Sequence, residues 1–293
     1  MKFLTFKQDG YETLGIASQD GKTVYALPEI GISYFNMNDL VGRLQVDDWQ
    51  TLNLFLKNPT GGIPYEDIEK CAPIPCPAQD VICLGENFRA HKKEAADYKK
   101  EAFDTEKGYP IYFSKRVGEA VADGGTIPAH ADITECMDYE AELAVIIGKE
   151  ADHVSRENAY NYIFGYTIMN DISARDIQTR HKQWYIGKSL DGFTPMGPWI
   201  VTADEIPGRP SLGIRSEVNG ELRQDGTTDD FIFDIAYCIS ELSQGIRLLP
   251  GTIISMGTPA GVGMGFNPPR FLKSGDTVTC SIDKIGTLRS TVR

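Results

Sequence analysis

The sequence lacks the patterns of a membrane-spanning helix and of a disulfide framework. No two of its six cysteines have the Cys-x-x-Cys spacing of zinc ribbons and thioredoxin-type sites. The longest apolar stretches fall well short of the roughly 20 residues that cross a bilayer, and the apolar run after Met1 is too short for a signal peptide. We therefore expect a cytoplasmic protein with reduced thiols and no membrane partner.

Positive charge is also scarce. The chain has 29 Lys and Arg residues against 41 Asp and Glu residues, which gives a formal net charge of −12, and no basic cluster offsets it. This balance excludes a general nucleic-acid or anionic-membrane binder. An acidic protein still binds a small anionic substrate where a metal ion supplies local positive charge.

Three common active-site motifs are absent. There is no Gly-x-Ser-x-Gly elbow, which argues against an α/β-hydrolase. The glycine-rich stretch 257–265 lacks the Gly-Lys-Ser/Thr of a P-loop, and it lacks a Rossmann spacing with a following acidic residue. The alternation of helices and strands of a doubly wound sheet is missing too, so nucleotide binding is not expected.

What is present is a succession of short apolar runs between turn residues, which predicts more strands than helices. We predict an α+β, mainly β fold, a roll or barrel with helices packed outside. The alternating prolines of residues 73–77 hold the chain extended, so we divide it into a small N-terminal domain, 1–72, and a catalytic domain, 78–293. The predicted strands cover residues 2–7, 12–17, 23–27, 81–85, 111–114, 137–148, 163–170, 214–218, 222–224, 252–256, 277–282 and 287–292. The predicted helices cover residues 47–56, 86–102, 155–158 and 233–242, with 172–184 a helix or helical loop and 187–198 a loop.

Glu140 and Glu142 open the apolar strand 137–148. Because side chains alternate along a strand, both acids point to the same side, roughly 7 Å apart. Two such carboxylates repel each other unless a positive group lies between them, and a divalent cation is the simplest one. The alternative is a strand end that exposes both acids to water. Asp171, which follows the predicted strand 163–170, would complete a three-carboxylate site suited to Mg²⁺ or Mn²⁺.

Asp171, Arg175 and Gln178 have helical spacing and would share one face of a helix. The alternative for Asp171 is a helix N-cap with an internal ion pair. His91 and Glu94 lie three residues apart on a helix that is polar on most faces, as suits a mobile lid. A carboxylate beside an imidazole prepares it as a general base, whereas a solvated surface pair is the alternative.

Three further residues are candidates for substrate binding or catalysis. His181 is the rival to His91 as the base. Lys188 lies in a loop rich in glycine and proline, where it would stabilise an enolate or oxyanion, or donate a proton if its pKa is lowered. Its alternative is an ordinary exposed lysine. Thr258, in the glycine-rich stretch, is a candidate for binding a substrate carboxylate.

Taken in order, these segments resemble the fumarylacetoacetate hydrolase family over roughly residues 80–293. The matching segments are Asn87–Glu94 around the histidine, Asp138–Ala144 around the two glutamates, Asn170–Asp176, Gly187–Pro198 around the lysine, and Gly257–Gly263. The resemblance implies a mixed β-roll domain, usually a homodimer, with Mg²⁺, Mn²⁺ or Ca²⁺ on the carboxylates. It also implies substrates that are 2-oxo acids or 1,3-dicarbonyl compounds.

By this resemblance, individual residues take roles. Glu140, Glu142 and Asp171 would hold the metal, and His91 with Glu94 would activate water. Lys188 and Arg175 would contact the substrate or stabilise developing charge, and Gln178 and Thr258 would be further substrate contacts. One departure is Lys115-Arg116, where many members have a Lys-Pro pair. The added charge would favour a longer dianionic substrate, or it lies on the surface.

These residues predict a metal-dependent hydrolase that cleaves a C–C bond in an acylpyruvate- or fumarylpyruvate-like 2-oxo acid. His91 would take a proton from the attacking water, and Lys188 would stabilise the departing enolate. The same site would also suit a tautomerase or isomerase, a decarboxylase, or a dehydratase of 2-oxo-3-deoxy sugar acids. A protein that only binds metal and organic acids is the non-enzymatic alternative.

Overall fold

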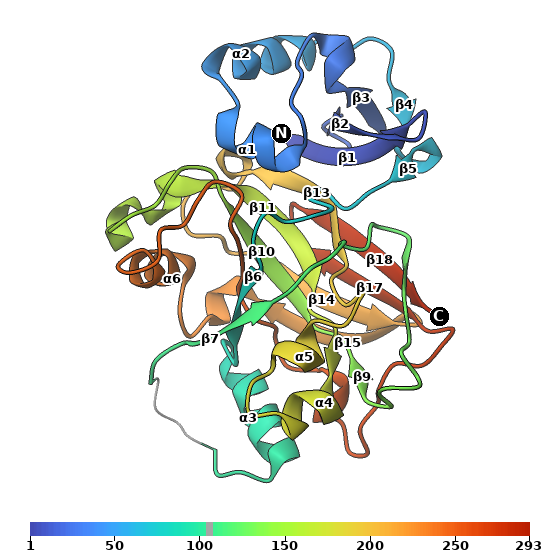
Figure 1. Cartoon of the computed structure of the whole chain (residues 1–293), viewed down its shortest axis with the longest axis vertical. Coiled ribbons are helices and arrows are strands. Elements are labelled where there is room, and N and C mark those ends of the chain that lie inside the picture. Colours follow the sequence, from blue (N-terminus) through green and yellow to red (C-terminus); the bar gives the residue numbers. More distant parts are fainter. Residues whose placement is uncertain (104–107) are drawn as a thin grey trace.

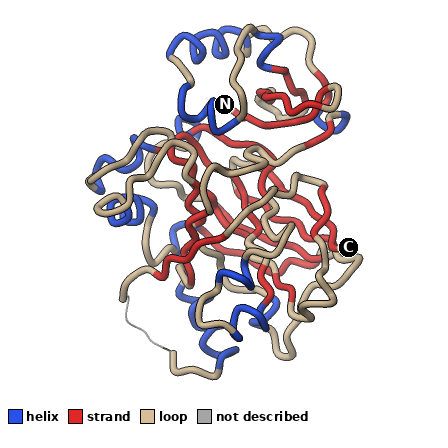
Figure 2. The backbone as a smooth tube through the Cα atoms, in the orientation of Figure 1, coloured by secondary structure: helices blue, strands red, loops and turns tan. Residues whose placement is uncertain are grey.

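The computed structural model describes residues 1–103 and 108–293 (Figure 1). Its helices are α1 (Met37–Arg43), α2 (Val46–Phe55), α3 (Arg89–Lys99), α4 (Arg175–Arg180), α5 (Tyr185–Lys188) and α6 (Ile235–Leu242). Its strands are β1 (Lys2–Gln8), β2 (Tyr11–Ala17), β3 (Thr23–Ala26), β4 (Ile63–Pro64), β5 (Glu69–Lys70), β6 (Val81–Gly85), β7 (Ile111–Lys115), β8 (Gly125–Ile127), β9 (Met137–Asp138), β10 (Ala141–Ile147), β11 (Ile163–Asn170), β12 (Ser173–Ala174), β13 (Met196–Thr202), β14 (Gly213–Val218), β15 (Glu221–Thr227), β16 (Ile253–Ser255), β17 (Thr277–Ile282) and β18 (Gly286–Val292). Strand dominates the interior and helices lie outside it (Figure 2), so the predicted mainly β fold class is confirmed.

The described strands form one 11-stranded sheet, one five-stranded sheet and a two-stranded ribbon. The large sheet runs β4-β3-β2-β1-β13-β11-β10-β16-β6-β7, with β5 paired to β1, and neither large sheet closes into a barrel within the described ranges. Its strand pairs are antiparallel except β16 with β6. The smaller sheet runs β15-β14-β17-β18-β8, and its first hairpin turns at Asn219-Gly220. Both turn residues have positive φ, 53° and 78°, as a tight two-residue hairpin requires.

Strand β10 lies at the centre of the core, and all seven of its residues are buried. Leu143, Val145 and Ile147 face one hydrophobic cluster, which also contains side chains of the smaller sheet. Ala144 and Ile146, which alternate with them, face a second cluster on the other side. Burial on both faces explains why this strand is a continuous apolar run in the sequence.

The N-terminal segment lies at one end of the molecule, shown in blue in Figure 1. It joins the large sheet because β1 pairs antiparallel with β13, with Lys2 opposite Val201 and Phe3 opposite Ile200. Phe3 also packs on Trp49 of α2, with ring centroids 6.0 Å apart. The division into domains 1–72 and 78–293 stays a prediction, but these contacts join the two parts into one hydrogen-bonded sheet.

Several predicted elements have different limits in the structure. The predicted lid helix, 86–102, begins only at Arg89 and ends at Lys99, because Phe88 is extended and Lys100 adopts a left-handed conformation with φ 57°. The predicted helical region 172–184 contains β12, α4 and a break before α5. The predicted loop 187–198 was wrong at both ends, since Lys188 is the last residue of α5 and Met196 begins β13. In the described ranges no helix is both long enough and apolar enough to pass through a lipid bilayer.

Candidate active site

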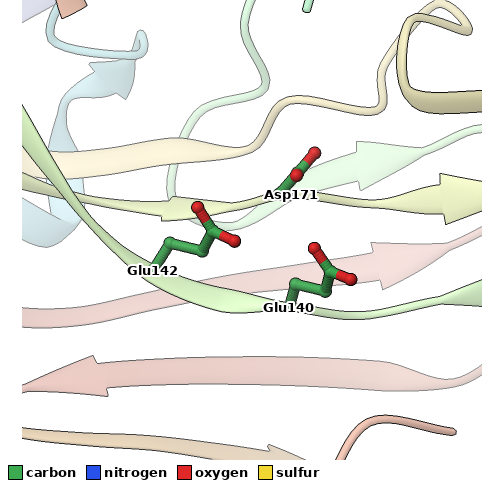
Figure 3. Close-up of side chains that lie close together, drawn as sticks. All are labelled: Glu140, Glu142 and Asp171. Carbon is green, nitrogen blue, oxygen red and sulfur yellow. The ribbon is translucent and has the colours of Figure 1, made fainter. Parts of the chain in front are cut away.

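Three carboxylates meet where β10 and β11 pair. Glu140 immediately precedes β10 and Glu142 lies on it, while Asp171 follows β11. Ala141 pairs with Asn170 in the antiparallel ladder, which places Asp171 beside Glu140, and the Asp171 amide donates to the Glu140 carbonyl oxygen at 2.9 Å. Each acid offers an oxygen within 4.8 Å of those of the other two (Figure 3). All three are buried, so the alternative of a solvated strand end is wrong.

Asp171 does not lie on the helix of Arg175 and Gln178, as the spacing predicted. It precedes β12, and α4 begins only at Arg175. The N-cap alternative was wrong as well, because Ala174 occupies that position. Arg175 and Gln178 nevertheless come together, and Arg175 Nη1 donates to Gln178 Oε1 at 3.1 Å.

Three basic side chains are buried against the acids. The Lys188 ammonium lies 2.6 Å from Glu140 Oε2 and 2.7 Å from Asp171 Oδ2. The Lys115 ammonium lies 2.6 Å from Asp171 Oδ1, the other oxygen of that carboxylate. Arg175 Nη2 lies 2.6 Å from Glu140 Oε1. Lys188 is therefore no ordinary exposed lysine, and Lys115 is buried as well. Arg116, which stands in place of the proline of the Lys-Pro pair, is exposed, so the added charge lies on the surface.

A fourth acid, Asp138, holds Arg175 from the opposite side. Its Oδ2 accepts from Arg175 Nε at 2.9 Å and from the Met264 amide at 3.0 Å. Glu142, by contrast, forms no ion pair within the described residues. Its Oε2 accepts hydrogen bonds from the Ser255 hydroxyl and, at 3.1 Å, from the Gly257 amide. The buried cluster thus contains four carboxylates but three cations, and the unmatched charge lies on Glu142.

The pKa values follow this distribution of charge. Burial raises the pKa of Glu142 well above its usual value, and the nearby charges of Asp171 and Glu140 raise it further. Burial alone would also raise the pKa of Glu140, but the positive charges of Arg175 and Lys188 bring it below the ordinary range. Burial would lower the pKa of Lys188, yet Asp171 and Glu140 hold it above its usual value. Lys188 therefore stays charged, and the proton-donor role considered from the sequence has no support.

The donor set fits a hard divalent cation. Three buried carboxylates supply oxygen ligands, the type that Mg²⁺ and Mn²⁺ prefer, and soft sulfur or imidazole ligands are missing from the group. A buried carboxylate with no basic partner is also costly unless a positive charge lies beside it. The adjoining cavity has a volume of about 30 Å³, which is enough for ordered water to complete a coordination shell.

His91 covers this cavity from the first turn of α3. Its ring is buried, and Nδ1 lies 3.4 Å from Glu94 Oε2, a long contact for a hydrogen bond. Glu94 Oε1 in turn accepts from the Gly261 amide at 2.8 Å, so the carboxylate is fixed from the glycine-rich loop. Ala95 on the same helix packs on Val262 of that loop. These contacts exclude a solvated surface pair; whether α3 moves as a lid stays a prediction.

The cavity brings together nearly all of the residues predicted from the sequence. Asp171 does not itself line this inner cavity, the one beside the carboxylates. His181 is exposed and lines a second cavity further out. The predicted residues that line the inner cavity are His91, Glu140, Glu142, Arg175, Gln178, Lys188 and Thr258.

Sequence reasoning gave no role to two buried polar residues of the site, Asp138 and Gln224, and it considered Lys115 only together with Arg116. Lys115 ends a short strand beside Arg116, and nothing in its neighbours distinguishes it from a surface lysine. Asp138 lies two residues before Glu140, so the alternation that paired the glutamates could have included it. Gln224 lies on β15 and is fully buried, although β15 is otherwise largely polar and exposed.

Comparison with known proteins identifies the family of this chain. The family model described as "Fumarylacetoacetate (FAA) hydrolase C-terminal" matches residues 80–293. Among curated proteins, the chain is similar to oxaloacetate tautomerase YisK of Bacillus subtilis (strain 168), with 46% identity over 226 residues, which cover 77% of this chain and 73% of the relative.

Two solved structures extend this comparison. The fold is similar to a fumarylacetoacetate hydrolase from the psychrophilic Exiguobacterium antarcticum, with TM-score 0.84, 36% identity, and 100% of this chain and 99% of that chain covered. It is also similar to fumarylpyruvate hydrolase from Pseudomonas aeruginosa, a structure in complex with Mn²⁺ and pyruvate. That match has TM-score 0.64 and 32% identity, and covers 74% of this chain and 90% of the other.

Proposed function

Because this chain belongs to the fumarylacetoacetate hydrolase family, we propose that it is a divalent-metal-dependent enzyme that interconverts the enol and keto forms of a short 2-oxo acid. The observation that carries the proposal is the unmatched Glu142 charge in a buried three-carboxylate group beside a buried histidine. A relative with 46% identity bears the name oxaloacetate tautomerase, which supports tautomerisation as the first candidate.

Glu140, Glu142 and Asp171 would hold the ion, which we propose is Mg²⁺ or Mn²⁺. Bound there, it would polarise the carbonyl group of the 2-oxo acid and stabilise negative charge on that oxygen. Mn²⁺ is supported by the fumarylpyruvate hydrolase structure that contains it. The remaining steps depend on side chains of this chain.

Lys188 and Arg175 would supply fixed positive charge to the substrate carboxylate or the enolate oxygen. Both are buried cations whose pKa values lie above the ordinary range, because carboxylates surround them. Charges held in place in a site closed to water stabilise an anion without reorganisation. Gln178, whose Oε1 is held by Arg175 at 3.1 Å, would contact the substrate beside them.

His91 would move the proton to and from the carbon next to the carbonyl group. It is the histidine that lines the inner cavity, and Glu94 lies against its Nδ1. That contact favours a proton on Nδ1 and leaves Nε2 as the base. Ketonisation breaks the O–H bond of the enol and forms a C–H bond at the neighbouring carbon, with no C–C bond cleaved, so a base that takes the proton from oxygen and returns one to carbon would serve it.

Hydrolysis of a C–C bond is the second candidate, and the same His91–Glu94 pair would serve it as the base. In that reaction His91 would take its proton from a water molecule that attacks the distal carbonyl group, and Lys188 would stabilise the departing enolate. Two similar structures bear hydrolase names. The two candidates share the metal site and differ in whether water enters beside the substrate.

The test is a panel of reactions run with Mg²⁺ or Mn²⁺: ketonisation of enol-oxaloacetate, decarboxylation of oxaloacetate, dehydration of a 2-oxo-3-deoxy sugar acid, and cleavage of acylpyruvates and fumarylpyruvate. We expect ketonisation to be fastest. His91→Ala should reduce it by about 10²- to 10⁴-fold, the usual contribution of a general base, while Mn²⁺ affinity is retained because His91 is no ligand. His153→Ala, at an exposed histidine, is the matched control.

Other outcomes select other functions. Release of pyruvate from an acylpyruvate at a higher kcat/KM than ketonisation would make the enzyme a hydrolase. Bound metal without turnover of any 2-oxo acid would favour a protein that only binds metal and organic acids. An unchanged rate in His91→Ala would contradict its role as the base.

A further inference from the structure

Thr258 is held in a closed ring of hydrogen bonds with Gln224 and Ala141. Gln224 Nε2 donates to the Thr258 hydroxyl at 2.6 Å, and that hydroxyl donates to the Ala141 carbonyl oxygen at 2.9 Å. The Ala141 amide closes the ring by donating to Gln224 Oε1 at 3.0 Å. Gln224 and Thr258 are at most 1% exposed, so water does not compete for these groups.

The direction of every hydrogen bond in the ring is determined by the backbone. The Ala141 amide can only donate, so the Gln224 atom facing it must be the carbonyl oxygen. The other end of the same amide lies 2.8 Å from the Pro259 carbonyl oxygen, which can only accept, so that end must be the NH₂ group. Gln224 therefore donates to Thr258, and the Thr258 proton has to point elsewhere, to Ala141.

This leaves the Thr258 hydroxyl without a proton for the cavity. A hydroxyl has one proton and two lone pairs. The proton is committed to Ala141, one lone pair is occupied by Gln224, and one lone pair remains. Because Thr258 is among the residues that line the inner cavity, a ligand oxygen that reaches its hydroxyl from there meets a hydrogen-bond acceptor.

We propose that Thr258 recognises a protonated oxygen of the ligand, the hydroxyl of an enol or 2-hydroxy acid, and that Gln224 is the positioning residue that fixes this polarity. This inference rests on the proposed function and specifies which form of the substrate the site selects. A substrate carboxylate has no proton to offer and would face the lone pair of Thr258. On this proposal the substrate carboxylate would bind elsewhere than at the Thr258 hydroxyl, which differs from the carboxylate-binding role predicted from the sequence.

The ring also positions the metal ligands. Ala141 lies between Glu140 and Glu142, and both its amide and its carbonyl group are held by the ring. The Gly257 amide, next to Thr258, donates to Glu142 at 3.1 Å. Hydrogen bonds thus fix the Thr258 hydroxyl relative to both glutamates. A protonated ligand oxygen bound to that hydroxyl would therefore be held in place relative to an ion on the glutamates.

The test compares the binding of pyruvate and of each lactate enantiomer by titration calorimetry, with Mn²⁺ saturating. The two acids match in size and carboxylate and differ in whether the C2 oxygen carries a proton. Thr258→Val should weaken the tighter-binding lactate enantiomer about 2- to 10-fold, the value of one neutral hydrogen bond, and leave pyruvate within about 2-fold. Thr258→Ser keeps the hydroxyl and should keep the wild-type ratio of the two affinities.

Gln224→Met removes the NH₂ group that sets the polarity. Circular dichroism first verifies that this variant is folded. The ratio of its lactate affinity to its pyruvate affinity should then fall toward the ratio of Thr258→Val, a change that a merely structural role for Gln224 would not produce. If Gln224→Met does not fold, the comparison of Thr258→Val with Thr258→Ser tests the proposal by itself.

Equal weakening of both acids in Thr258→Val would overturn the inference and assign the hydroxyl to the carboxylate. Unchanged affinity for both acids would overturn it as well. If the Mn²⁺-loaded wild-type protein binds neither acid, the proposed function itself fails and takes the inference with it.

Discussion

Replacing Glu140 and Glu142 separately by glutamine is expected to change the stability of the metal-free protein in opposite directions. The two substitutions are the same in size and lie two residues apart, at side chains that are 3% and 1% exposed. They differ in their charge partners. Glu140 contacts Arg175 and Lys188, whereas Glu142 has hydroxyl and amide donors instead.

Glu142→Gln should stabilise the protein in a chelator, increasingly so as the pH rises. The ordinary pKa of 4.5 applies to the unfolded chain, and the folded pKa is raised. Between these two values the folded state retains a proton that the unfolded state has lost, so the free energy of unfolding falls by about 1.4 kcal/mol per pH unit. Glutamine has no such proton and keeps an acceptor for Ser255. The free energy of unfolding of the variant should therefore equal that of wild type at a pH near the unfolded pKa of Glu142. Above that pH it should exceed the wild-type value by about 1.4 kcal/mol for each pH unit, up to the folded pKa.

Glu140→Gln should destabilise the protein by about 3–5 kcal/mol, because it leaves Arg175 and Lys188 buried with one fewer negative partner. Its folded pKa is lowered, so the contribution of this carboxylate is present at neutral pH and is lost only as the pH falls through that depressed value. The measurement is urea denaturation in EDTA between pH 5 and pH 8, followed by circular dichroism. Both variants should lose Mn²⁺ affinity, since each removes a ligand charge.

The matched control is Glu119→Gln, at an exposed glutamate, which should stay within about 0.5 kcal/mol of wild type at every pH. Destabilisation of similar size in Glu140→Gln and Glu142→Gln would refute the assignment of the unmatched charge to Glu142. So would a difference between wild type and Glu142→Gln that does not change with pH.

Two further substitutions test the second layer of contacts. Lys115→Met removes the ammonium 2.6 Å from Asp171 Oδ1 and should lower the free energy of unfolding by about 3–5 kcal/mol in urea denaturation, where a loss under 1 kcal/mol would contradict a buried ion pair. Gly265→Ala places a methyl group against the Glu94 carboxylate, a flexible group that can yield, so kcat should fall about 10- to 100-fold while the melting temperature stays near wild type. Wild-type kcat in that variant would mean that Glu94 does not position His91.

Much of the fold could be predicted from local periodicity, whereas the composition of the site was implied largely by the resemblance to a known family. The apolar run 137–148 predicted a core strand, and the predicted strands 214–218 and 222–224 flank Asn219-Gly220, where the hairpin turns. The matching motif segments supplied nearly all of the predicted residues that the fold brings to one cavity. The prediction failed where glycine and proline were taken to mean loop, since α5 extends to Lys188 and β13 begins at Met196, inside the two ends of the predicted loop 187–198.

What the sequence could not reveal were partners chosen by tertiary contact. Lys115 meets Asp171 across 56 positions of the chain, and Gln224 meets Ala141 across 83. Neither contact has a local pattern, because each residue lies on a strand whose own neighbours are polar or partly exposed. Only the pairing of distant strands makes a lysine and a glutamine part of the site.

The charge count of the buried cluster resolves an apparent conflict between an acidic protein and an anionic substrate. The chain has a net charge of −12, which repels an organic acid at long range. Inside the cluster, Asp138, Glu140 and Asp171 balance the three positive charges of Lys115, Arg175 and Lys188, and Glu142 is a fourth carboxylate that keeps its proton up to its raised pKa. A divalent ion that displaced this proton would bring the sum of charges to +1, which matches one carboxylate of a 2-oxo acid. The metal would then be required for binding the substrate as well as for activating it, and the arrangement of basic residues would set how much negative charge the bound ligand can carry.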